Sequence, residues 1–298
     1  MPTTHDYYDD PRNKDIKIYI NGDFFHRNDA KVSVLDSGFI LGDGVWEGVR
    51  LNNGKLLHLE KHLDRLFFGA SQLSLDIHLS RDEIKEAIMS TLKLNEMRTD
   101  VHIRLVISRG LKKTPYQHPK ATVGSPTIVI IPEYKIADKS VLDKGIKLAL
   151  VETIRDFRVQ DPKINSLSKH NCIAACIEAE KKGADEGLML DPDGFVSTCN
   201  STNFFIIRSS EVWTSSGQYC LHGITRSTVI DLCKQNNIPV FEKNFLIEDV
   251  YTADEIFVTG TFAGVIPVIK IDDVLVSNGS RGELTHTLQK YYREHLEV

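Results

Sequence analysis

Short apolar runs in the first half of the chain predict an antiparallel sheet. Residues 16–20 form a β-branched run, and the Asn21-Gly22 pair that follows is typical of a tight hairpin turn. Residues 24–34 are therefore expected to return as a strand. Residues 101–108 and 127–132 have the length and composition of further strands. We expect the fold to open with this sheet.

Helical spacing of apolar residues separates these strands. Between residues 59 and 73, apolar side chains recur every three or four positions, as they do on one face of a helix. Ser80 and Glu83 have the spacing of a capping box, which predicts a second helix ending near residue 94. We expect these two helices to cover the sheet.

The second half of the chain alternates strand-like and helix-like segments, which predicts a second α/β domain. Gly183 can end one helix in a left-handed cap, and Pro192-Asp193-Gly194 is typical of a tight turn between two strands. The strands are expected at residues 146–153, 187–191, 195–207 and 255–271, and the helices at residues 168–183 and 225–236.

A polar stretch divides the two halves. Residues 133–143 carry few large apolar side chains, as expected of a linker. We predict a small N-terminal domain at 1–134, a linker at 135–143 and a larger C-terminal domain at 144–298. A chain of 298 residues is long enough for two packed domains.

Composition and charge narrow the range of partners. The net charge is −5 with acidic and basic residues interspersed, so we expect no extended basic face for nucleic acid. No apolar run approaches the length that spans a bilayer, so a membrane is not an expected partner either. Residues 1–15 lack the apolar core of a signal peptide and the Arg-rich, acid-poor character of a transit segment. We therefore expect a cytoplasmic protein.

The cysteines predict packing rather than metal binding or disulfides. Their number is odd and they lack paired zinc-knuckle spacing: they are Cys172, Cys176, Cys199, Cys220 and Cys233. Cys172 and Cys176 could share one helix face, but no histidine or further cysteine completes a set of ligands. We expect small buried thiols and no metal site.

Residues 161–205 carry three motifs in order. They read DPKINSLSKHNC at 161–172, EAEKKGADEGLMLD at 178–191 and GFVSTCNSTNFF at 194–205. These resemble the patterns DPxxKSLNxxNN, EAxxxGADEALxLD and GxVxEGxxxNxF of the class IV aminotransferases, which are fold-type IV pyridoxal-phosphate (PLP) enzymes. With further motifs, the resemblance spans about residues 16–285. It implies an α/β (α+β) fold with a small two-layer domain and a larger pseudo-barrel domain.

A phosphate clamp is implied by several of these motifs. Gly223-Ile224-Thr225-Arg226 precedes a predicted helix, so backbone N–H groups and the helix dipole converge where a dianion could sit. It resembles the GITR element of the family, although a plain turn before a helix would look the same. Arg65 matches the arginine of the HxxRL element, which is a phosphate ligand in the family; the alternative is a solvated helix arginine.

A third element of the clamp is expected near residue 260. Residues 259–268 resemble the TSTxxEITPV segment of the family. The resemblance implies Thr261 and Phe262 as cofactor contacts beside Ile224 and Thr225. Gly264 stands where the family usually has glutamate, a difference that would leave the clamp intact and alter the adjoining wall.

The chain departs from the family at the position of the Schiff-base lysine, which is Asn165 here. PLP chemistry needs a lysine to hold the aldehyde as an imine and to move protons. Lys163 and Lys169 are the nearby candidates, and in another context both would be interpreted as surface lysines. We favour Lys169, because the branched-chain enzymes place there a tyrosine that reaches the cofactor. We predict that the Schiff-base lysine has moved to Lys169.

The second departure is Thr198, which replaces the glutamate that binds the pyridine nitrogen. A carboxylate keeps that nitrogen protonated, whereas a hydroxyl can form a hydrogen bond with a neutral nitrogen. Carbanions would then be less stabilised. Elimination, racemisation or binding alone therefore become alternatives to transamination.

Substrate recognition is expected from one tryptophan and three arginines. Trp46 and Arg50 lie in GDGVWEGVR at 42–50, which resembles the GxxxFEGxR element. Arg109, in Ser-Arg-Gly, resembles the carboxylate-binding arginine of D-amino-acid aminotransferases, and Arg104 lies near that of the branched-chain enzymes. At least one of the three arginines is expected to be a surface or ion-pair residue, and the handedness of the substrate stays open.

The function predicted from the resemblance is PLP-dependent transfer of an amino group between an amino acid and a 2-oxo acid. The resemblance also implies a homodimer. Two alternatives remain, a PLP lyase or racemase on the same fold and a non-catalytic PLP-binding homologue.

Overall fold

The computed structural model describes residues 10–158 and 160–297. Residues 1–9, on which the prediction about targeting segments partly rests, lie outside the described residues. The chain divides into two compact units, which we call the N-terminal and the C-terminal unit. The N-terminal unit contains residues 10–136 together with Ile164–Lys169, and the C-terminal unit contains the remaining described residues. The change of unit at residue 136 lies inside the predicted linker.

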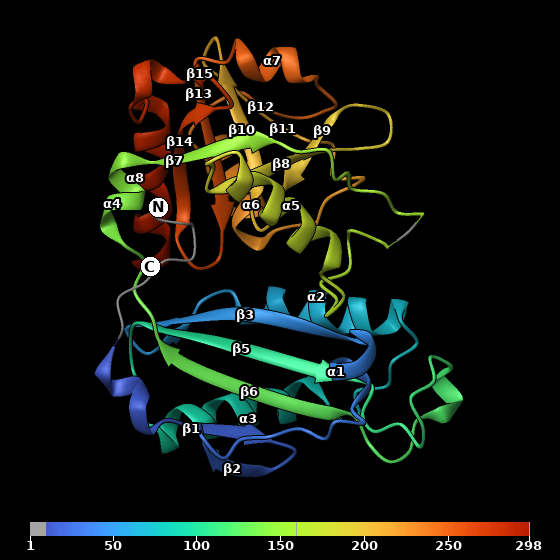
Figure 1. Cartoon of the computed structure of the whole chain (residues 1–298). Coiled ribbons are helices and arrows are strands. Elements are labelled where there is room, and N and C mark those ends of the chain that lie inside the picture. The colour runs from blue at the N-terminus through green and yellow to red at the C-terminus, as the bar shows by residue number, and fades with distance from the viewer. Residues whose placement is uncertain (1–9, 159, 298) are drawn as a thin grey trace. The chain divides into compact units, whose positions relative to one another are not determined.

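The N-terminal unit is built on a six-stranded antiparallel sheet with the order β2-β1-β6-β5-β3-β4 (Figure 1). Its strands are β1 (Lys17–Ile20), β2 (Asp23–His26), β3 (Gly44–Asn52), β4 (Lys55–Leu56), β5 (Val101–Ser108) and β6 (Thr127–Tyr134). The predicted strand at 24–34 ends at His26, because a turn follows and short helix α1 (Ser37–Leu41) begins soon after.

Two helices cover this sheet, as the spacing of apolar residues predicted. They are α2 (Leu59–Gln72), which contacts β3, and α3 (Arg81–Leu94), which contacts β1 and β6. The capping box predicted at Ser80 and Glu83 is present at the start of α3. Apolar side chains from both helices and from alternate positions of β3, β5 and β6 form one core. The unit thus has two layers, and we call the sheet face opposite α2 and α3 the second face.

The C-terminal unit is built on a nine-stranded mixed sheet that curls into a half-barrel. The strand order is β12-β11-β10-β13-β14-β7-β8-β9, with β15 paired to β14. These strands are β7 (Ile146–Leu150), β8 (Glu186–Leu190), β9 (Val196–Cys199), β10 (Asn203–Arg208), β11 (Glu211–Thr214), β12 (Val240–Glu242), β13 (Glu255–Gly260), β14 (Gly264–Ile271) and β15 (Val274–Leu275). The predicted strand at 255–271 is therefore a hairpin of two strands.

Five helices complete this unit: α4 (Lys139–Lys144), α5 (His170–Lys181), α6 (Ile224–Gln235), α7 (Ile247–Tyr251) and α8 (Glu283–Glu297). Helices α6 and α8 pack on each other and on β13. Residues 10–158 and 160–297 also form three short 3-10 helices, η1 (Pro11–Asp15), η2 (Pro119–Ala121) and η3 (Ser277–Gly279). The predicted architecture of a small two-layer domain and a larger pseudo-barrel domain is confirmed.

The five cysteines are free thiols, but the prediction that they are all buried is wrong. Cys199, Cys220 and Cys233 are buried, whereas Cys172 is half-buried and Cys176 is exposed. The reason is the face that α5 buries, which is made by Ala175 and Ala179. Among the described residues, no helix combines the length and apolar character needed to cross a membrane. Within the same residues, no cluster of three histidine, cysteine or acidic side chains could hold a metal ion.

Candidate functional site

The second face of the N-terminal sheet carries a cation on an aromatic ring. Alternate residues of β5 fill the core, so Arg104 points to the opposite face. Gly48 lies directly across from it on β3, and Trp46 lies one step further along the same face. The guanidinium carbon of Arg104 is 3.8 Å from the centre of the Trp46 ring, a cation–π contact.

The guanidinium of Arg104 has no hydrogen-bond acceptor among residues 10–158 and 160–297. Burial lowers the pKa of Arg104, and the negative charges of Glu133 and Glu47 partly oppose this effect. A partly buried guanidinium without acceptors can bind a carboxylate in a bidentate manner. Of the three arginines predicted to bind substrate, Arg104 best fits that role.

The segment Ile164–Lys169 is hydrogen-bonded to β3. The N–H of Trp46 donates to the Asn165 carbonyl (3.0 Å), and the Asn165 side-chain amide donates to the Trp46 carbonyl (2.7 Å). The indole N–H donates to the Ser166 carbonyl (3.1 Å). Three hydrogen bonds therefore hold this segment beside Trp46.

The amine of Lys169 contacts the side chain of Asn165, the residue that replaces the family's lysine. Its Nζ donates to Asn165 Oδ1 at 3.2 Å and lies 5.4 Å from the centre of the Trp46 ring. Lys163, the other candidate, belongs to the C-terminal unit and shows no corresponding contact with Asn165 or Trp46 among the described interactions.

Arg65 is held by a buried carboxylate. Its Nε and Nη2 donate to Glu47 at 2.8 Å each, and His62 Nδ1 lies 2.7 Å from Glu47 Oε2. Burial alone would raise the pKa of Glu47, but Arg65 and His62 outweigh it and hold that pKa below its ordinary value. Burial also lowers the pKa of His62. The position of the Arg65 guanidinium is thus fixed from inside the unit.

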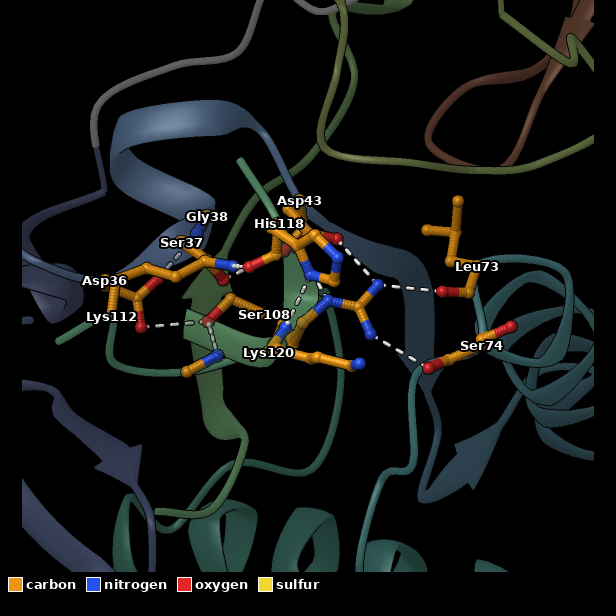
Figure 2. Close-up of polar contacts among 12 residues, drawn as sticks. Asp36, Ser37, Gly38, Asp43, Leu73, Ser74, Ser108, Lys112, His118 and Lys120 are labelled. Carbon is orange, nitrogen blue, oxygen red and sulfur yellow. Dashed lines mark hydrogen bonds and ion pairs between the residues drawn. The ribbon is translucent and has the colours of Figure 1, made fainter. Parts of the chain in front are cut away.

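Arg109 is bound inside its own unit. Its Nε and Nη2 donate to Asp43 at 2.7 and 3.0 Å, and further bonds reach the carbonyls of Leu73 (2.8 Å) and Ser74 (2.9 Å). Figure 2 shows these acceptors, Asp43, Leu73 and Ser74, converging on one guanidinium. Arg50 donates through Nη1 to the Lys135 carbonyl (2.6 Å).

In the C-terminal unit, Thr198 lies at the end of β9 beside a tight loop. Its Oγ1 donates to the Thr202 carbonyl (2.8 Å), which also accepts the N–H of Cys199 (3.0 Å). Thr202 in turn donates its hydroxyl to Glu186 (2.8 Å). Thr198 is buried. Its hydroxyl proton is therefore already used within the unit.

The N-terminus of α6 lies against the next strand after this loop. A Cβ on Gly223, the residue before α6, would lie 2.0 Å from Asn203 Oδ1, so only glycine fits there. Asn203 is paired with Thr259 across β10 and β13, and its amide also donates to the Leu221 carbonyl (2.9 Å). The predicted elements at Thr198, at 223–225 and at 259–261 are thus brought together in one unit.

This region fits a phosphate dianion. Gly223 offers no side chain to cap α6, and the first turn of the helix has no acidic residue. The N–H groups of the first turn, which no side chain caps, and the helix dipole would therefore attract an anion. Thr259, next to the predicted ligand segment, has a buried hydroxyl without a hydrogen-bond partner among the described residues. A bound oxyanion is one way to satisfy such a group.

Helix α8 packs beside the turn that contains Thr261 and Phe262. Thr261 is half-buried and Phe262 is buried in the turn between β13 and β14. Gly264 follows with a φ of +75°, and a Cβ there would lie 2.8 Å from the ring of Tyr292. The hydroxyls of Tyr292 and Thr225 are 3.4 Å apart. Glycine in place of the family's glutamate thus makes room for the ring of Tyr292.

Sequence reasoning missed three residues around these elements. Glu186 lies in a recognised motif but was given no role, and Thr202 lies in the next motif without one. Tyr292 lies 67 residues beyond Thr225, and the local pattern of α8 gives no signal for the contact between them. Only the folded chain reveals these neighbours.

Comparison with known proteins gives consistent matches over almost the whole chain. The model of the family described as amino-transferase class IV matches residues 44–271. Branched-chain-amino-acid aminotransferase-like protein 1 of Arabidopsis thaliana is 39% identical over 95% of this chain and 51% of its own length. The chain therefore spans about half the length of that relative.

Two further relatives match along nearly their full length. A putative branched-chain-amino-acid aminotransferase of Methanocaldococcus jannaschii is 38% identical over 94% of this chain and 96% of its own. A D-alanine aminotransferase of Listeria monocytogenes is 31% identical over the same shares.

Solved structures of branched-chain aminotransferases have the same fold. The Escherichia coli enzyme superimposes with a TM-score of 0.88 and 26% identity over 95% of both chains. The T.th. enzyme, solved with N-(5′-phosphopyridoxyl)-L-glutamate, gives a TM-score of 0.86 and 28% identity over 95% of this chain and 94% of its own.

Proposed function

The chain belongs to the class IV aminotransferase family, and we propose that it transfers an amino group between an amino acid and a 2-oxo acid with PLP as cofactor. The observation that supports this proposal most is the position of Lys169. Its amine lies 3.2 Å from Asn165 Oδ1, next to the position that the family's lysine would occupy. The site therefore still contains an amine, that of Lys169, although the family's own lysine is replaced by Asn165.

The C-terminal unit supplies the proposed phosphate ligands. Backbone N–H groups of Ile224 and Thr225 at the start of α6, together with Thr261, would bind the phosphate, and Phe262 would pack beside it. Arg65 of the N-terminal unit is proposed as a further ligand from its motif, with its guanidinium oriented by Glu47. Thr198 is proposed as the partner of the ring nitrogen.

The remaining roles belong to the second face of the N-terminal sheet. When bound, PLP supplies an aldehyde that bonds to amines and a ring that stabilises negative charge on the substrate. Lys169 would hold the cofactor and move a proton to and from the substrate carbon. Arg104 would bind the substrate carboxylate, and Trp46 would orient both cations through its ring. Arg50 and Arg109 are tied to acceptors of their own unit and are not proposed as carboxylate ligands.

Self-association is part of the proposal. Large apolar side chains are exposed along residues 32–41 and 111–123, and they include Val34, Phe39, Leu111 and Tyr116. Backbone hydrogen bonds join residues 35–37 to residues 110–112, so the two segments lie side by side there. We propose a homodimer, to be tested by sedimentation equilibrium. A cytoplasmic location remains a prediction.

Reduction with borohydride followed by peptide mapping tests the role of Lys169. We expect the pyridoxyl label on the peptide that contains Lys169 and the same label in a Lys163→Ala variant. A label on Lys163, or no label on protein that binds PLP, would overturn the assignment. A 2-oxo acid should also convert the pyridoxamine form of the protein back to the pyridoxal form.

One observation supports a second candidate function on the same fold. Thr198 provides no carboxylate for the ring nitrogen, which favours lyase or racemase chemistry. Product analysis separates these functions, because a lyase releases a keto acid without any amino acceptor and a racemase inverts the amino acid. A protein that binds PLP but turns over no amino acid would be a non-catalytic homologue.

A further inference from the structure

We propose that Thr198 accepts a hydrogen bond from the ring nitrogen of PLP and that the cofactor is therefore bound with this nitrogen protonated. The inference rests on the proposed function, because it requires PLP at Thr198. It reverses the expectation from the sequence, in which a hydroxyl at this position donates to a neutral nitrogen.

The hydroxyl of Thr198 has a single proton, and its position in the fold commits that proton. Thr198 is 3% exposed, and its Oγ1 donates to the Thr202 carbonyl at 2.8 Å. The same carbonyl accepts the N–H of Cys199 at 3.0 Å, which closes residues 198–202 into a tight loop. Turning the hydroxyl away would take from the Thr202 carbonyl one of its two hydrogen bonds. In this arrangement the oxygen of Thr198 has only lone pairs left for a ligand.

A neutral pyridine nitrogen also has only a lone pair. Two acceptors cannot form a hydrogen bond, and a buried contact between them would be repulsive. A protonated nitrogen carries an N–H that can donate to Thr198 Oγ1, and such a bond to a charged donor is stronger than a neutral one. The hydrogen-bond arrangement therefore selects the protonated form.

A buried carboxylate next to the loop favours the same form. Glu186 on β8 is 1% exposed and accepts the hydroxyls of Ser201 (2.6 Å) and Thr202 (2.8 Å). Both hydroxyl groups therefore donate to the same buried carboxyl group. Its field is felt locally, since burial and then the charge of Glu186 raise the pKa of the Cys199 thiol well above its ordinary value. A nearby negative charge favours a cationic ring nitrogen.

The arrangement restores the protonated ring nitrogen that the family's glutamate would otherwise maintain. Glu186 is a positioning residue, because it acts through Thr202 and through its charge rather than by contact with the cofactor. A protonated ring is a strong electron sink. The inference therefore favours transamination over the alternatives that a neutral ring would permit.

The test uses PLP labelled with ¹⁵N in the ring and the full-length protein. We expect the ¹⁵N chemical shift of the bound cofactor to be that of a pyridinium at neutral pH. The shift of an unprotonated pyridine in protein that binds PLP would overturn the inference and leave the proposed function standing. Failure to bind PLP, or borohydride labelling outside Lys169, would instead contradict the proposed function.

Variants separate hydrogen bonding from simple loss of packing. Thr198→Val should lower the equilibrium constant for protonation of the bound ring nitrogen about tenfold or more, because a charge-assisted hydrogen bond is lost. Thr198→Ser should restore it. Glu186→Gln should shift the same equilibrium in the same direction by a smaller factor, about threefold to tenfold.

Thr214→Val is a matched control. Thr214 is a buried threonine of the same unit that also donates to a backbone carbonyl, that of Phe204, at 2.8 Å. It should lose similar stability and leave the ¹⁵N shift unchanged. If Thr198→Val does not fold, the ¹⁵N shifts of Thr198→Ser and Glu186→Gln still test the inference. A wild-type pyridinium signal that Glu186→Gln and Thr198→Val leave unchanged would refute the roles assigned to both residues.

Discussion

Arg104 and Arg109 lie five residues apart at one sheet of the N-terminal unit, but their guanidinium groups differ in their hydrogen bonds. Arg109, just beyond β5, gives four hydrogen bonds to Asp43, Leu73 and Ser74. Arg104, in the middle of β5, rests on Trp46 and has no acceptor among the described residues. The two regions therefore show an internally satisfied charge and an available one.

The surroundings of Arg109 reinforce the difference. Ser108 donates to Asp36 (2.9 Å), Asp36 also caps α1 through the N–H of Gly38 (2.8 Å), and buried Lys112 donates to the His118 carbonyl (3.2 Å) (Figure 2). The first of these contacts joins β5 to the segment before α1, and the other two close local turns. Polar groups at this end of β5 thus hold loops in place, whereas Arg104 contacts the Trp46 ring and is proposed to bind a ligand.

The largest effect is expected at the available region, from Lys169→Ala. If the Lys169 amine moves the substrate proton, its loss should lower kcat by about 10⁴-fold, the upper end for general acid–base catalysis. The melting temperature should change little, because the amine's contact with Asn165 is only partly buried. Steady-state kinetics and calorimetry measure both quantities. Lys163→Ala is the control and should retain activity; the reverse result would exclude Lys169.

Removing one partner of a buried ion pair should instead lower stability, and we expect the clearest loss in Glu47→Gln. The variant leaves Arg65 and His62 without their buried carboxylate. We expect the free energy of unfolding to fall by about 3–5 kcal/mol, as for other disrupted buried ion pairs. Urea denaturation measures it. Asp82→Asn, which alters an exposed acid on α3, is the control. Equal stability of the two variants would show that the buried pair contributes nothing.

The difference between Arg104 and Arg109 is tested by replacing each arginine with methionine. Arg104→Met should lower kcat/KM about 10²-fold, because bonds to a charged carboxylate are lost, and should leave the melting temperature nearly unchanged. Arg109→Met should do the opposite and lower the free energy of unfolding by about 2 kcal/mol. Activity and thermal unfolding of both variants decide. A stability loss in Arg104→Met without a kinetic effect would reverse the assignment.

A smaller effect is expected from pH at the buried histidine. The pKa of His62 is lowered in the folded chain, so the unfolded chain binds more protons below its ordinary value of about 6.5. Stability should therefore fall as pH drops through this region, by at most about 1.4 kcal/mol per pH unit for one proton. Unfolding at pH 7.5 and 5.5 measures it. His62→Gln should lose this component, and an unchanged slope in that variant would refute the assignment.

Several elements could be predicted from local sequence because their signals are local. The capping box at Ser80, the helix that covers β3 and the strand at Val101–Ser108 depend on residues a few positions apart. The hairpin at 255–271 was predicted as one strand, although Gly260 and Gly264 flank its turn and Gly264 has a φ of +75°. Exposure of Cys176 depends on which face α5 packs inward.

The amino-acid sequence by itself indicated two α/β domains, and its resemblance to the class IV aminotransferases implied the pseudo-barrel and the departures from the family at residues 165 and 198. These follow from motifs and periodicities that are written along the chain. Only the tertiary structure decided which charges are already paired, namely Arg109 with Asp43 and Arg65 with Glu47. It also decided that the Thr198 hydroxyl already donates a hydrogen bond within its own unit. The physical reason is that hydrogen-bond partners often come from residues distant in sequence, so the availability of a group is a property of the folded chain.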